Sequence, residues 1–330
     1  MEAKIKHLEK LAGELIKISQ DEDFLYRVEG QNQWFTPNFV KHSLDNIISE
    51  FLNVTALKNW LNNYSLSNKY SVGIILAGNI PAVGFHDILC SYFAADKVYI
   101  KLSSKDSLLT QTILNRWVEI DPEWKQRLEI VERMGKCDKI IATGSNSAFN
   151  YFEQYFSKYQ NILRRNRTSM AIVHNNISAK ELDSLIDNIF LYFGLGCRNV
   201  SKLWIERGFE LARIFEASER YNYFFNHVKY MNNYDYQRTL LLLNKIPHLS
   251  NNFLMLKEDN ILFSAISVLH YEYFDKDEDF LQDIEAKKED LQCVIGRGFI
   301  PFGHGQKPSL VDYADGVDTM EFLLKNDSIK

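Results

Sequence analysis

The sequence predicts an α/β protein with a parallel sheet, preceded by a helical segment. From about residue 70, short apolar runs of strand length alternate with stretches whose apolar residues recur at helical spacing. This alternation is typical of βαβ units, in which helices cover both faces of a parallel sheet. The chain has 330 residues, enough for two domains with a large core.

The first 65 residues show helical patterns only. Apolar side chains between Glu2 and Ser19 recur at helical spacing, and Thr36-Pro37 is typical of a helix start, an N-cap followed by proline at the first helical position. A helix is expected from Pro37 to about Phe51, and a short one around Leu57 to Leu61. We expect this part to be a helical lead-in (1–65) without catalytic residues.

The alternating part of the chain gives a specific order of elements. Strands are expected at 71–76, 97–101, 128–131, 139–142, 170–173, 201–205, near 253–256 and 265–270, and at 291–295. Helices are expected at 83–95, 107–118, 145–157, 181–192, 208–227 and 276–289. Neither G-x-G-x-x-G nor G-x-x-x-x-G-K-[ST] occurs, which argues against a standard Rossmann enzyme and a phosphate-loop protein.

Composition excludes several classes of protein. The net charge is −5 and the longest basic stretch is Arg164-Arg165-Asn166-Arg167, so we expect no nucleic-acid partner. No apolar run approaches the roughly 20 residues of a membrane span, and the amphipathic N-terminus does not read as a signal peptide. The four cysteines form no C-x-x-C pair, so neither a disulfide framework nor a metal site is expected, and a reducing, cytoplasmic location fits.

One cysteine has a setting suited to nucleophilic chemistry. Cys197 lies in Tyr192–Ser201, on a glycine-flanked turn between a helix and a strand. Gly194 and Gly196 leave room for another molecule, and the neighbouring Arg198 favours the thiolate. Local features alone leave a buried structural cysteine as the alternative.

Five segments, in chain order, resemble motifs of the aldehyde dehydrogenase superfamily. They are Gly78-Asn79-Ile80-Pro81, its asparagine-proline turn; Val98–Ser104, its strand ending in Lys-Pro-Ser-Glu; Ile141–Ser145, its Thr-Gly-Ser turn; Phe193–Cys197, its nucleophile loop; and Pro301-Phe302-Gly303, its late turn. Further segments look like a bacterial acyl-CoA reductase branch of that superfamily, related to the fatty-acid reductase that feeds aldehyde to bacterial luciferase. They are Trp34–Thr36, Ala77–Leu89, Ile141–Asn146, Tyr192–Lys202, Lys229–Tyr236 and Asp312–Leu323.

The resemblance covers nearly the whole chain and implies an aldehyde dehydrogenase-like fold. An NAD(P)-binding, Rossmann-like domain would span residues 1–190, and a smaller α/β catalytic domain carrying the cysteine would span 191–330. Cys197 would attack a thioester carbonyl and form an acyl-enzyme. The side-chain amide of Asn79 and the backbone N–H of Cys197 would hold the oxyanion. Read alone, Asn79 is an ordinary turn residue before a proline.

The resemblance also implies a cofactor site. Lys101 would hydrogen-bond the adenosine ribose, and Thr143-Gly144-Ser145 would begin a helix whose N-terminal amides face the pyrophosphate. Their plain alternatives are an edge lysine and a serine N-cap. After Ser103, the ribose-gripping glutamate of the superfamily is Ser104, followed by Lys105, which could pair with a 2′-phosphate. We therefore expect NADPH, with NADH as the alternative.

Two departures from the superfamily bear on the chemistry. Its hydrolytic members carry a glutamate base in a segment that reads Arg164–Thr168 here, without a carboxylate. That suits a reductase, which must protect its acyl-enzyme from water. The glutamate that holds the nicotinamide ribose is replaced by Ile261.

The expected function is NADPH-dependent reduction of a long-chain acyl-CoA, or acyl carrier thioester, to the aldehyde. The alternatives are an aldehyde dehydrogenase that releases acid and a non-catalytic acyl-CoA-binding relic. The resemblance allows a homodimer. The remaining candidates have structural readings: His86 as a structural histidine, Cys90, Cys137 and Cys293 as core residues, and Asp312, Asp315 and Asp318 as a solvated face or oligomer contact rather than a cation site.

Overall fold

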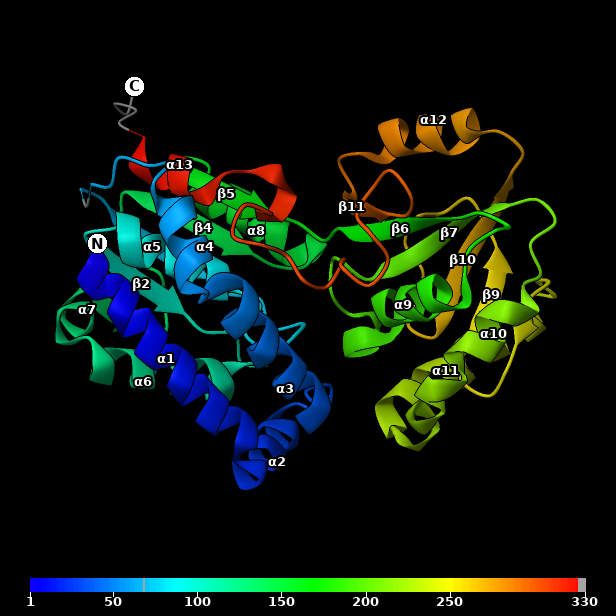
Figure 1. Ribbon diagram of the computed structural model, residues 1–330, viewed down its shortest axis with the longest axis horizontal. Helices are drawn as coiled ribbons and strands as arrows, with labels where there is room; N and C mark the ends of the chain where they lie inside the picture. The colour runs from blue at the N-terminus through cyan, green and yellow to red at the C-terminus, as the bar shows by residue number, and fades with distance from the viewer. Residues whose placement is uncertain (68, 326–330) are drawn as a thin grey trace. The chain divides into compact units, whose positions relative to one another are not determined.

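The computed structural model describes residues 1–67 and 69–325, which form two compact units (Figure 1). The first comprises Met1–Asn166 and the chain from Pro308 onward, and the second comprises Arg167–Lys307. The chain thus leaves the first unit at Asn166 and not at residue 190, and its C-terminal part returns to that unit. The expected boundary was misplaced because alternating strands and helices do not reveal which sheet each strand joins.

The first unit contains the lead-in and a five-stranded sheet. Its elements are α1 (Glu2–Gln20), α2 (Glu22–Gln31), α3 (Pro37–Asn46), the π-helical turn η1 (Ile47–Phe51), α4 (Val54–Leu61), β1 (Ser71–Ile75), α5 (Phe85–Ala94), β2 (Lys97–Lys101), α6 (Ser107–Ile120), α7 (Pro122–Arg127), β3 (Leu128–Ile130), β4 (Lys139–Thr143), α8 (Asn146–Phe156), β5 (Gln160–Arg164), η4 (Ala314–Gly316) and α13 (Thr319–Leu324). The short edge strand β5 and the helix α2 were not predicted.

The strand order β3-β2-β1-β4-β5, all parallel, aligns the carboxyl ends of three strands. Ile75 of β1 is in register with Lys101 of β2 and with Ala142 of β4. Helices α5 and α6 pack on one face of the sheet, and α8 covers the other through Phe152 and Phe156. The chain therefore leaves β1 and β4 toward opposite faces of the sheet. The place between the carboxyl ends of these two strands is a topological switch point, where open α/β sheets bind ligands.

The lead-in holds the turns that follow β1 and β2. Ser43 of α3 donates a hydrogen bond from Oγ to the carbonyl oxygen of Pro81 at 2.7 Å. Asn32, after α2, donates from Nδ2 to the carbonyl oxygen of Lys105 at 3.2 Å. The helices expected to lack catalytic residues thus fix the backbone at the carboxyl edge of the sheet.

The C-terminal segment that begins at Pro308 packs into the first unit, where it contacts buried charged side chains. Lys139, 1% exposed, donates from Nζ to the carbonyl oxygens of Phe322, Leu323 and Lys325 at the end of α13. Arg164 forms a buried ion pair with Asp87, its NH2 lying 3.0 Å from Oδ1. The arginine that ends β5 is therefore engaged within the first unit.

The second unit is built on a six-stranded sheet of order β11-β6-β7-β10-β9-β8. Its elements are β6 (Thr168–Val173), α9 (Ala179–Phe190), the 3₁₀ turn η2 (Leu191–Gly194), β7 (Val200–Glu206), α10 (Ala212–Ser218), η3 (Glu219–Asn226), α11 (Val228–Leu243), β8 (Leu249–Ser250), β9 (Met255–Glu258), β10 (Val268–Phe274), α12 (Asp277–Lys287) and β11 (Leu291–Ile295). All the strands are parallel except β8. Every residue of β6 is buried, as expected of a central parallel strand.

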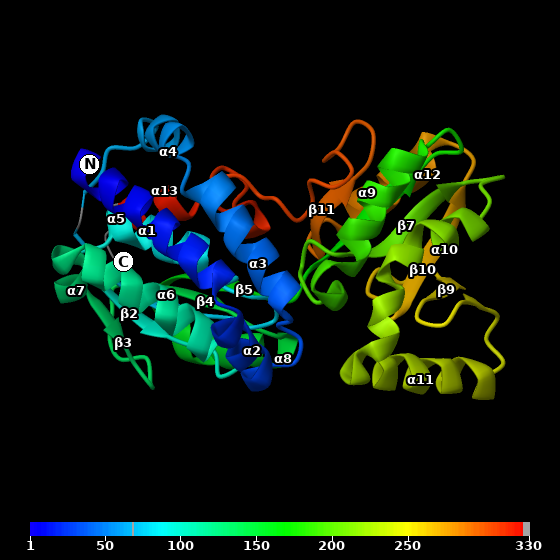
Figure 2. The same cartoon turned by 60° about the horizontal axis from the view of Figure 1, so that its bottom comes forward.

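Helix α11, labelled in Figure 2, was not predicted. Its apolar residues do not form a stripe at helical spacing. It packs through tyrosines instead. Tyr230 donates from its hydroxyl to the carbonyl oxygen of Phe253 at 3.0 Å, and the hydroxyl of Tyr234 bonds to the carbonyl oxygen of Asn251. These tyrosine hydrogen bonds therefore attach α11 to the rest of the unit, as the packing of an apolar stripe would otherwise do.

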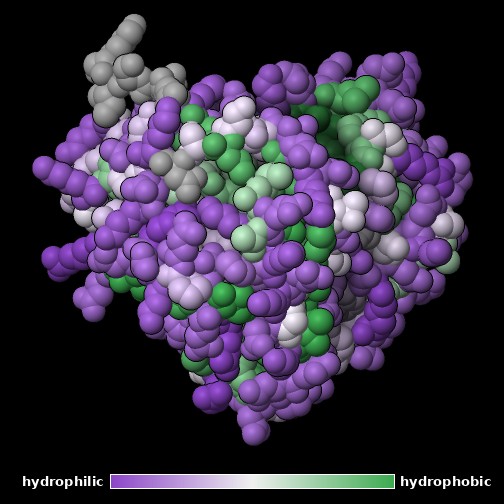
Figure 3. Space-filling view, turned by 60° about the vertical axis from the view of Figure 1, so that its left-hand side comes forward, coloured by the Kyte–Doolittle hydropathy of each residue, from purple (hydrophilic) through white to green (hydrophobic). Residues whose placement is uncertain are grey.

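The face drawn in Figure 3 is predominantly hydrophilic, with apolar side chains scattered over it. Within residues 1–67 and 69–325, no helix is long and apolar enough to cross a membrane.

Candidate functional site

Cys197 lies in the second unit, on the loop between η2 and β7, with its side chain half-buried. The other three cysteines are buried. Burial raises the pKa of Cys90 and raises that of Cys137 to about 11, which disfavours their thiolates at neutral pH. The thiol singled out by the sequence is thus the most accessible of the four.

Asn199 organises the nucleophile loop from within. Its side chain is almost fully buried, and Oδ1 accepts a hydrogen bond from the backbone N–H of Gly196 at 2.8 Å. Its Nδ2 lies within hydrogen-bond distance of the carbonyl oxygens of Asn188, Ile189 and Leu191, at 3.1, 3.2 and 2.8 Å. One amide thereby satisfies carbonyls left open where α9 ends. Sequence reasoning missed this residue, although it stands two positions after the cysteine.

The backbone before the cysteine is strained. Tyr192, Phe193 and Gly194 have φ values of 55°, 57° and 76°, in the left-handed region that suits only the glycine. Such a conformation costs roughly 1–2 kcal/mol for an L-residue with a Cβ. Packing holds it in place, because the Phe193 ring lies against those of Phe224 and His227, at centroid distances of 4.4 and 4.2 Å. Strain of this kind is found at functional sites.

Two hydroxyls of β6 contact the nucleophile loop. Ser169, fully buried, donates from Oγ to the carbonyl oxygen of Cys197 at 3.0 Å, and its Oγ also lies 3.0 Å from Sγ of Cys293. Thr168 Oγ1 lies 3.2 Å from the carbonyl oxygen of Asn199. This strand begins at Thr168, the last residue of the segment in which the resemblance locates a missing base. The groups it brings to the cysteine loop are hydroxyls, which do not take a proton from water at neutral pH.

The late Pro301-Phe302-Gly303 turn packs against α9 beside the same loop. The backbone N–H of Gly303 donates to Oδ1 of Asn188 at 2.8 Å. A Cβ at Gly305 would come within 2.8 Å of Nδ2 of Asn188, so the chain approaches closely here. An Arg198 guanidinium nitrogen lies 3.5 Å from the carbonyl oxygen of Gly305. Two of the motifs named from the sequence therefore meet in the second unit.

The remaining candidate site residues lie at the carboxyl edge of the first unit's sheet. Asn79 is half-buried in the turn after β1. Lys101 ends β2 and is also half-buried, while Ser104 and Lys105 in the following turn are exposed. A Cβ at Gly78 would come within 2.8 Å of Cβ of Ser103, so the two turns pack directly on each other. The edge thus brings the Asn79 turn next to the candidate cofactor residues.

The third strand end at this edge carries Thr143, Gly144 and Ser145. Ser145 is the N-cap of α8, accepting the N–H of Ala148 at 3.3 Å, so its plain N-cap role is confirmed. A Cβ at Gly144 would come within 2.9 Å of Ala148 and 2.8 Å of Phe152. Glycine is needed there because the strand end approaches the helix so closely.

Sequence reasoning missed Asp106, which ties the two turns together. Its carboxyl is 3% exposed, and Oδ2 accepts hydrogen bonds from the N–H of Ala82 at 2.8 Å and from the hydroxyl of Thr110 at 3.0 Å. Ala82 has a φ of 51°, so this bond holds an unfavourable backbone conformation three residues after Asn79. Burial raises the pKa of Asp106 to about 7.

His86 has a structural setting, as expected, whereas Asp318 is engaged within the first unit rather than lying on a solvated face. The ring of His86 stacks among Phe51, Trp60 and Tyr313, and its Nε2 lies 3.1 Å from the carbonyl oxygen of Leu310. Asp318 is the N-cap of α13. Among the residues that the structure describes, no group of histidine, cysteine and carboxylate side chains could hold a metal ion.

The fold is that of an aldehyde dehydrogenase. The chain is similar to aldehyde dehydrogenase 21 from Physcomitrella patens in complex with succinate, with a TM-score of 0.62 and 12% identity over 89% of this chain and 73% of that one. It is similar to an indole-3-acetaldehyde dehydrogenase in complex with NAD⁺, with a TM-score of 0.61 and 14% identity over 89% and 72%. A third is glyceraldehyde-3-phosphate dehydrogenase GapN from Methanocaldococcus jannaschii in complex with NADP, with a TM-score of 0.63 and 11% identity over 89% and 75%.

Within that fold, the sequence identifies the family. Residues 5–216 match the acyl-CoA reductase (LuxC) family, and the chain belongs to it. The protein is accordingly an oxidoreductase of a family that acts on aldehydes. No curated protein is significantly similar to the chain in sequence.

Proposed function

We propose that the protein reduces an acyl thioester, a long-chain acyl-CoA or its carrier equivalent, to the aldehyde with NADPH through an acyl-enzyme on Cys197. The observation that carries this proposal is the environment of the thiol. Cys197 is half-buried on a strained loop that Asn199 holds, and β6 brings hydroxyls rather than a carboxylate to that loop. Such a site favours acylation and disfavours hydrolysis.

The chain's own residues account for acylation. The Cys197 thiolate attacks the thioester carbonyl, and the CoA sulfur leaves as a thiolate, so no general base is needed for this step. The backbone N–H of Cys197 and the amide of Asn79 are assigned to the developing oxyanion; one such donor is worth about 3 kcal/mol. Once the acyl carbon has received hydride, its bond to Sγ of Cys197 would break, with Cys197 leaving as the thiolate and the aldehyde released.

The carboxyl edge of the first sheet fits a dinucleotide with a 2′-phosphate. Exposed Ser104 and Lys105 lie in the turn after β2, and the N-terminus of α8 follows β4 at the same edge. Lys101, Ser103 and Thr143–Ser145 complete the proposed set. Solved aldehyde dehydrogenases similar to this chain bind NAD⁺ or NADP. Bound NADPH would supply the hydride.

Intact-mass measurement with a panel of acyl-CoAs tests the proposal. Without NADPH, the wild type should accumulate one acyl adduct, located on Cys197 by peptide mapping. Addition of NADPH should discharge this adduct as aldehyde. Cys197→Ala should abolish both, while Cys293→Ala is the matched control, because Cys293 also contacts Ser169 but is buried.

Two outcomes would favour the alternatives. Acid as the main product in the presence of NADPH would indicate an aldehyde dehydrogenase. A Cys197 thiol that neither acylates nor reacts with iodoacetamide faster than a free cysteine would indicate a non-catalytic relic.

A further inference from the structure

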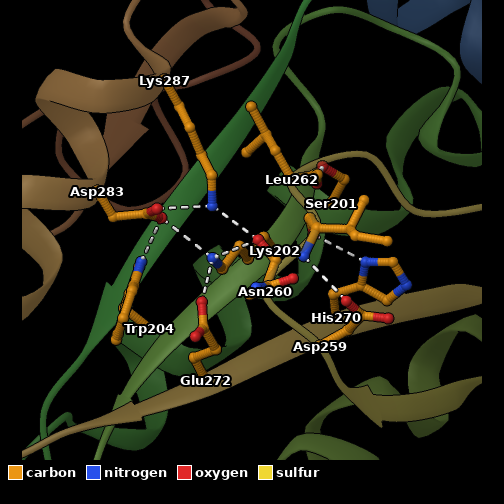
Figure 4. A network of polar contacts seen from close by, with 11 residues as sticks. Ser201, Lys202, Trp204, Asp259, Asn260, Leu262, His270, Glu272, Asp283 and Lys287 are labelled. Atoms are coloured by element: carbon orange, nitrogen blue, oxygen red, sulfur yellow. Dashed lines mark hydrogen bonds and ion pairs between the residues drawn. The ribbon is translucent and has the colours of Figure 1, made fainter.

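A short loop in the second unit is held almost entirely by side chains. The carbonyl oxygens of Asn260, Ile261 and Leu262 all accept hydrogen bonds from neighbouring elements (Figure 4). His270 of β10 donates from Nδ1 to Ile261 at 2.9 Å, and Ser201 of β7 donates from Oγ to Leu262 at 2.7 Å. Because a carbonyl only accepts, the proton of His270 resides on Nδ1.

The third carbonyl is held by two lysines. The carbonyl oxygen of Asn260 accepts from Nζ of Lys287 at 2.7 Å and from Nζ of Lys202 at 3.2 Å. The side chain of Lys202 is fully buried, and its charge is met by Glu272 and by Asp283, the latter at 3.0 Å. Burial opposes the charge, but these partners outweigh it and raise the pKa of Lys202, so the ammonium persists at neutral pH.

The cluster is balanced in charge and shared among three elements. Asp283 of α12 also pairs with Lys287 at 2.6 Å and accepts from Nε1 of Trp204 at 3.0 Å. Two lysines thus face two carboxylates, Asp283 and Glu272, around one backbone oxygen. A packed apolar cluster would stabilise a core as well as a buried ion network does, so such a network is better explained by the geometry it imposes.

The loop is linked to the nucleophile loop through the start of β7. Ser201, whose hydroxyl donates to Leu262, accepts from Oγ1 of Thr168 at 2.8 Å, and the carbonyl oxygen of Asn199, 3.2 Å from the same Oγ1, is the alternative acceptor for its single proton. Ser201 and Lys202 follow Cys197 by only four and five positions. The same strand therefore bears the cysteine loop at its start and the anchors of the 260–262 loop directly after it.

We propose that Lys202 is a positioning residue that fixes the loop Asn260–Leu262 beside the nucleophile loop, as a preformed part of the active site. Ile261 is 55% exposed while its backbone is held on both sides, and in this proposal its apolar side chain contacts the bound reactants. This inference rests on the proposed function. Misplacing such an element by about 1 Å costs about 10²-fold in rate.

The test uses a charge-neutral pair of substitutions in the full chain. Lys202→Met with Glu272→Gln removes one charge of each sign and leaves the Asp283–Lys287 pair intact. We expect kcat for acyl-CoA reduction to fall about 10–100-fold, the midpoint of thermal unfolding to stay within a few degrees, and the rate of Cys197 alkylation by iodoacetamide to remain unchanged. Lys287→Met should lower kcat less, because Lys202 still holds Asn260. Lys288→Met, at the exposed residue directly after α12, is the matched control and should have no effect.

Hydrogen exchange of the 259–263 segment supplies a readout independent of turnover. Exchange should accelerate in the double variant and not in Lys288→Met. The proposal is overturned if the double variant keeps wild-type kcat and KM. It is also overturned if kcat falls only in proportion to the fraction of Cys197 that iodoacetamide can still alkylate. A wild type inactive on every acyl-CoA refutes the proposed function instead, and the exchange data then still decide whether Lys202 positions the loop.

Discussion

The buried carboxyl of Asp106 should make the stability of the first unit depend on pH in a way that one substitution can isolate. Its Oδ1 has no hydrogen-bond partner among the described residues, while Oδ2 accepts two. Burial raises its pKa from 3.8 to about 7, although hydrogen bonds from Thr110 and Ala82 act in the opposite direction. Between these two values, the folded protein keeps a proton that the unfolded chain has released.

Folding therefore takes up a proton in this window, and stability must fall as pH rises through it. The loss begins near pH 4, the pKa of the unfolded chain, and levels off above the folded-state pKa of about 7. Each pH unit within the window is worth about 1.4 kcal/mol. From pH 5 to pH 8 this carboxyl should thus reduce the free energy of unfolding by about 3 kcal/mol.

Asp106→Asn removes the titration but keeps an oxygen that can accept the Ala82 N–H. Urea unfolding followed by tryptophan fluorescence reports mainly on the relevant unit, because four of the five tryptophans belong to it and only Trp204 lies in the second unit. Between pH 5 and pH 8, the stability of the variant relative to the wild type should rise by about 3 kcal/mol. Equal pH dependence in the two proteins would refute the reasoning.

A second buried aspartate in the same unit is the control. Asp121 is as little exposed as Asp106, but hydrogen bonds from Tyr92, Trp124 and His7 outweigh burial and lower its pKa. Its stabilising contribution is present above pH 4 and is lost only in more acidic solution. Asp121→Asn should therefore show a much smaller relative gain in stability between pH 5 and pH 8 than Asp106→Asn.

The remaining predictions concern the catalytic steps. If Ser104 stands where the superfamily has its ribose-gripping carboxylate, as the proposed function implies, kcat/KM should be higher with NADPH than with NADH, and Lys105→Glu should reduce that preference; equal or better kcat/KM with NADH in the wild type would refute it. Asn79→Ala should leave NADPH affinity intact and slow single-turnover acylation about 10²–10³-fold, whereas an unfolded or fully active variant would make Asn79 a turn residue only. Asn199→Ala leaves the Gly196 N–H and several carbonyls unpaired, at a cost of about 1–3 kcal/mol for each group that stays buried. Its melting temperature and its rate of Cys197 alkylation should both change, and an unchanged alkylation rate would contradict the role given to Asn199.

Much of the first sheet could be predicted because its strands are buried on both faces. Strands β1, β2 and β4 appear within one residue of the expected positions, since continuous apolar runs such as Val72–Ile75 are typical of strands buried on both faces of a parallel sheet. Strand β5 escaped notice because it lies at the edge and contributes little apolar sequence, with only Ile162 and Leu163 between polar residues. Its pairing with β4 depends on the tertiary structure, and no local sequence pattern predicts it.

The parts of the candidate site that consist of one residue in a local motif could be predicted from the sequence. The parts that consist of polar groups brought together from distant positions could not. Cys197 and its glycines carry a recognisable motif. Nothing near Lys202 indicates that a lysine within an apolar strand would be buried, since its compensating charges, Glu272 and Asp283, are seventy and more residues away. Hydrophobic periodicity would put such a lysine on an exposed face. A buried lysine in mid-strand is costly unless distant carboxylates converge on it, so it indicates a site that periodicity alone cannot find.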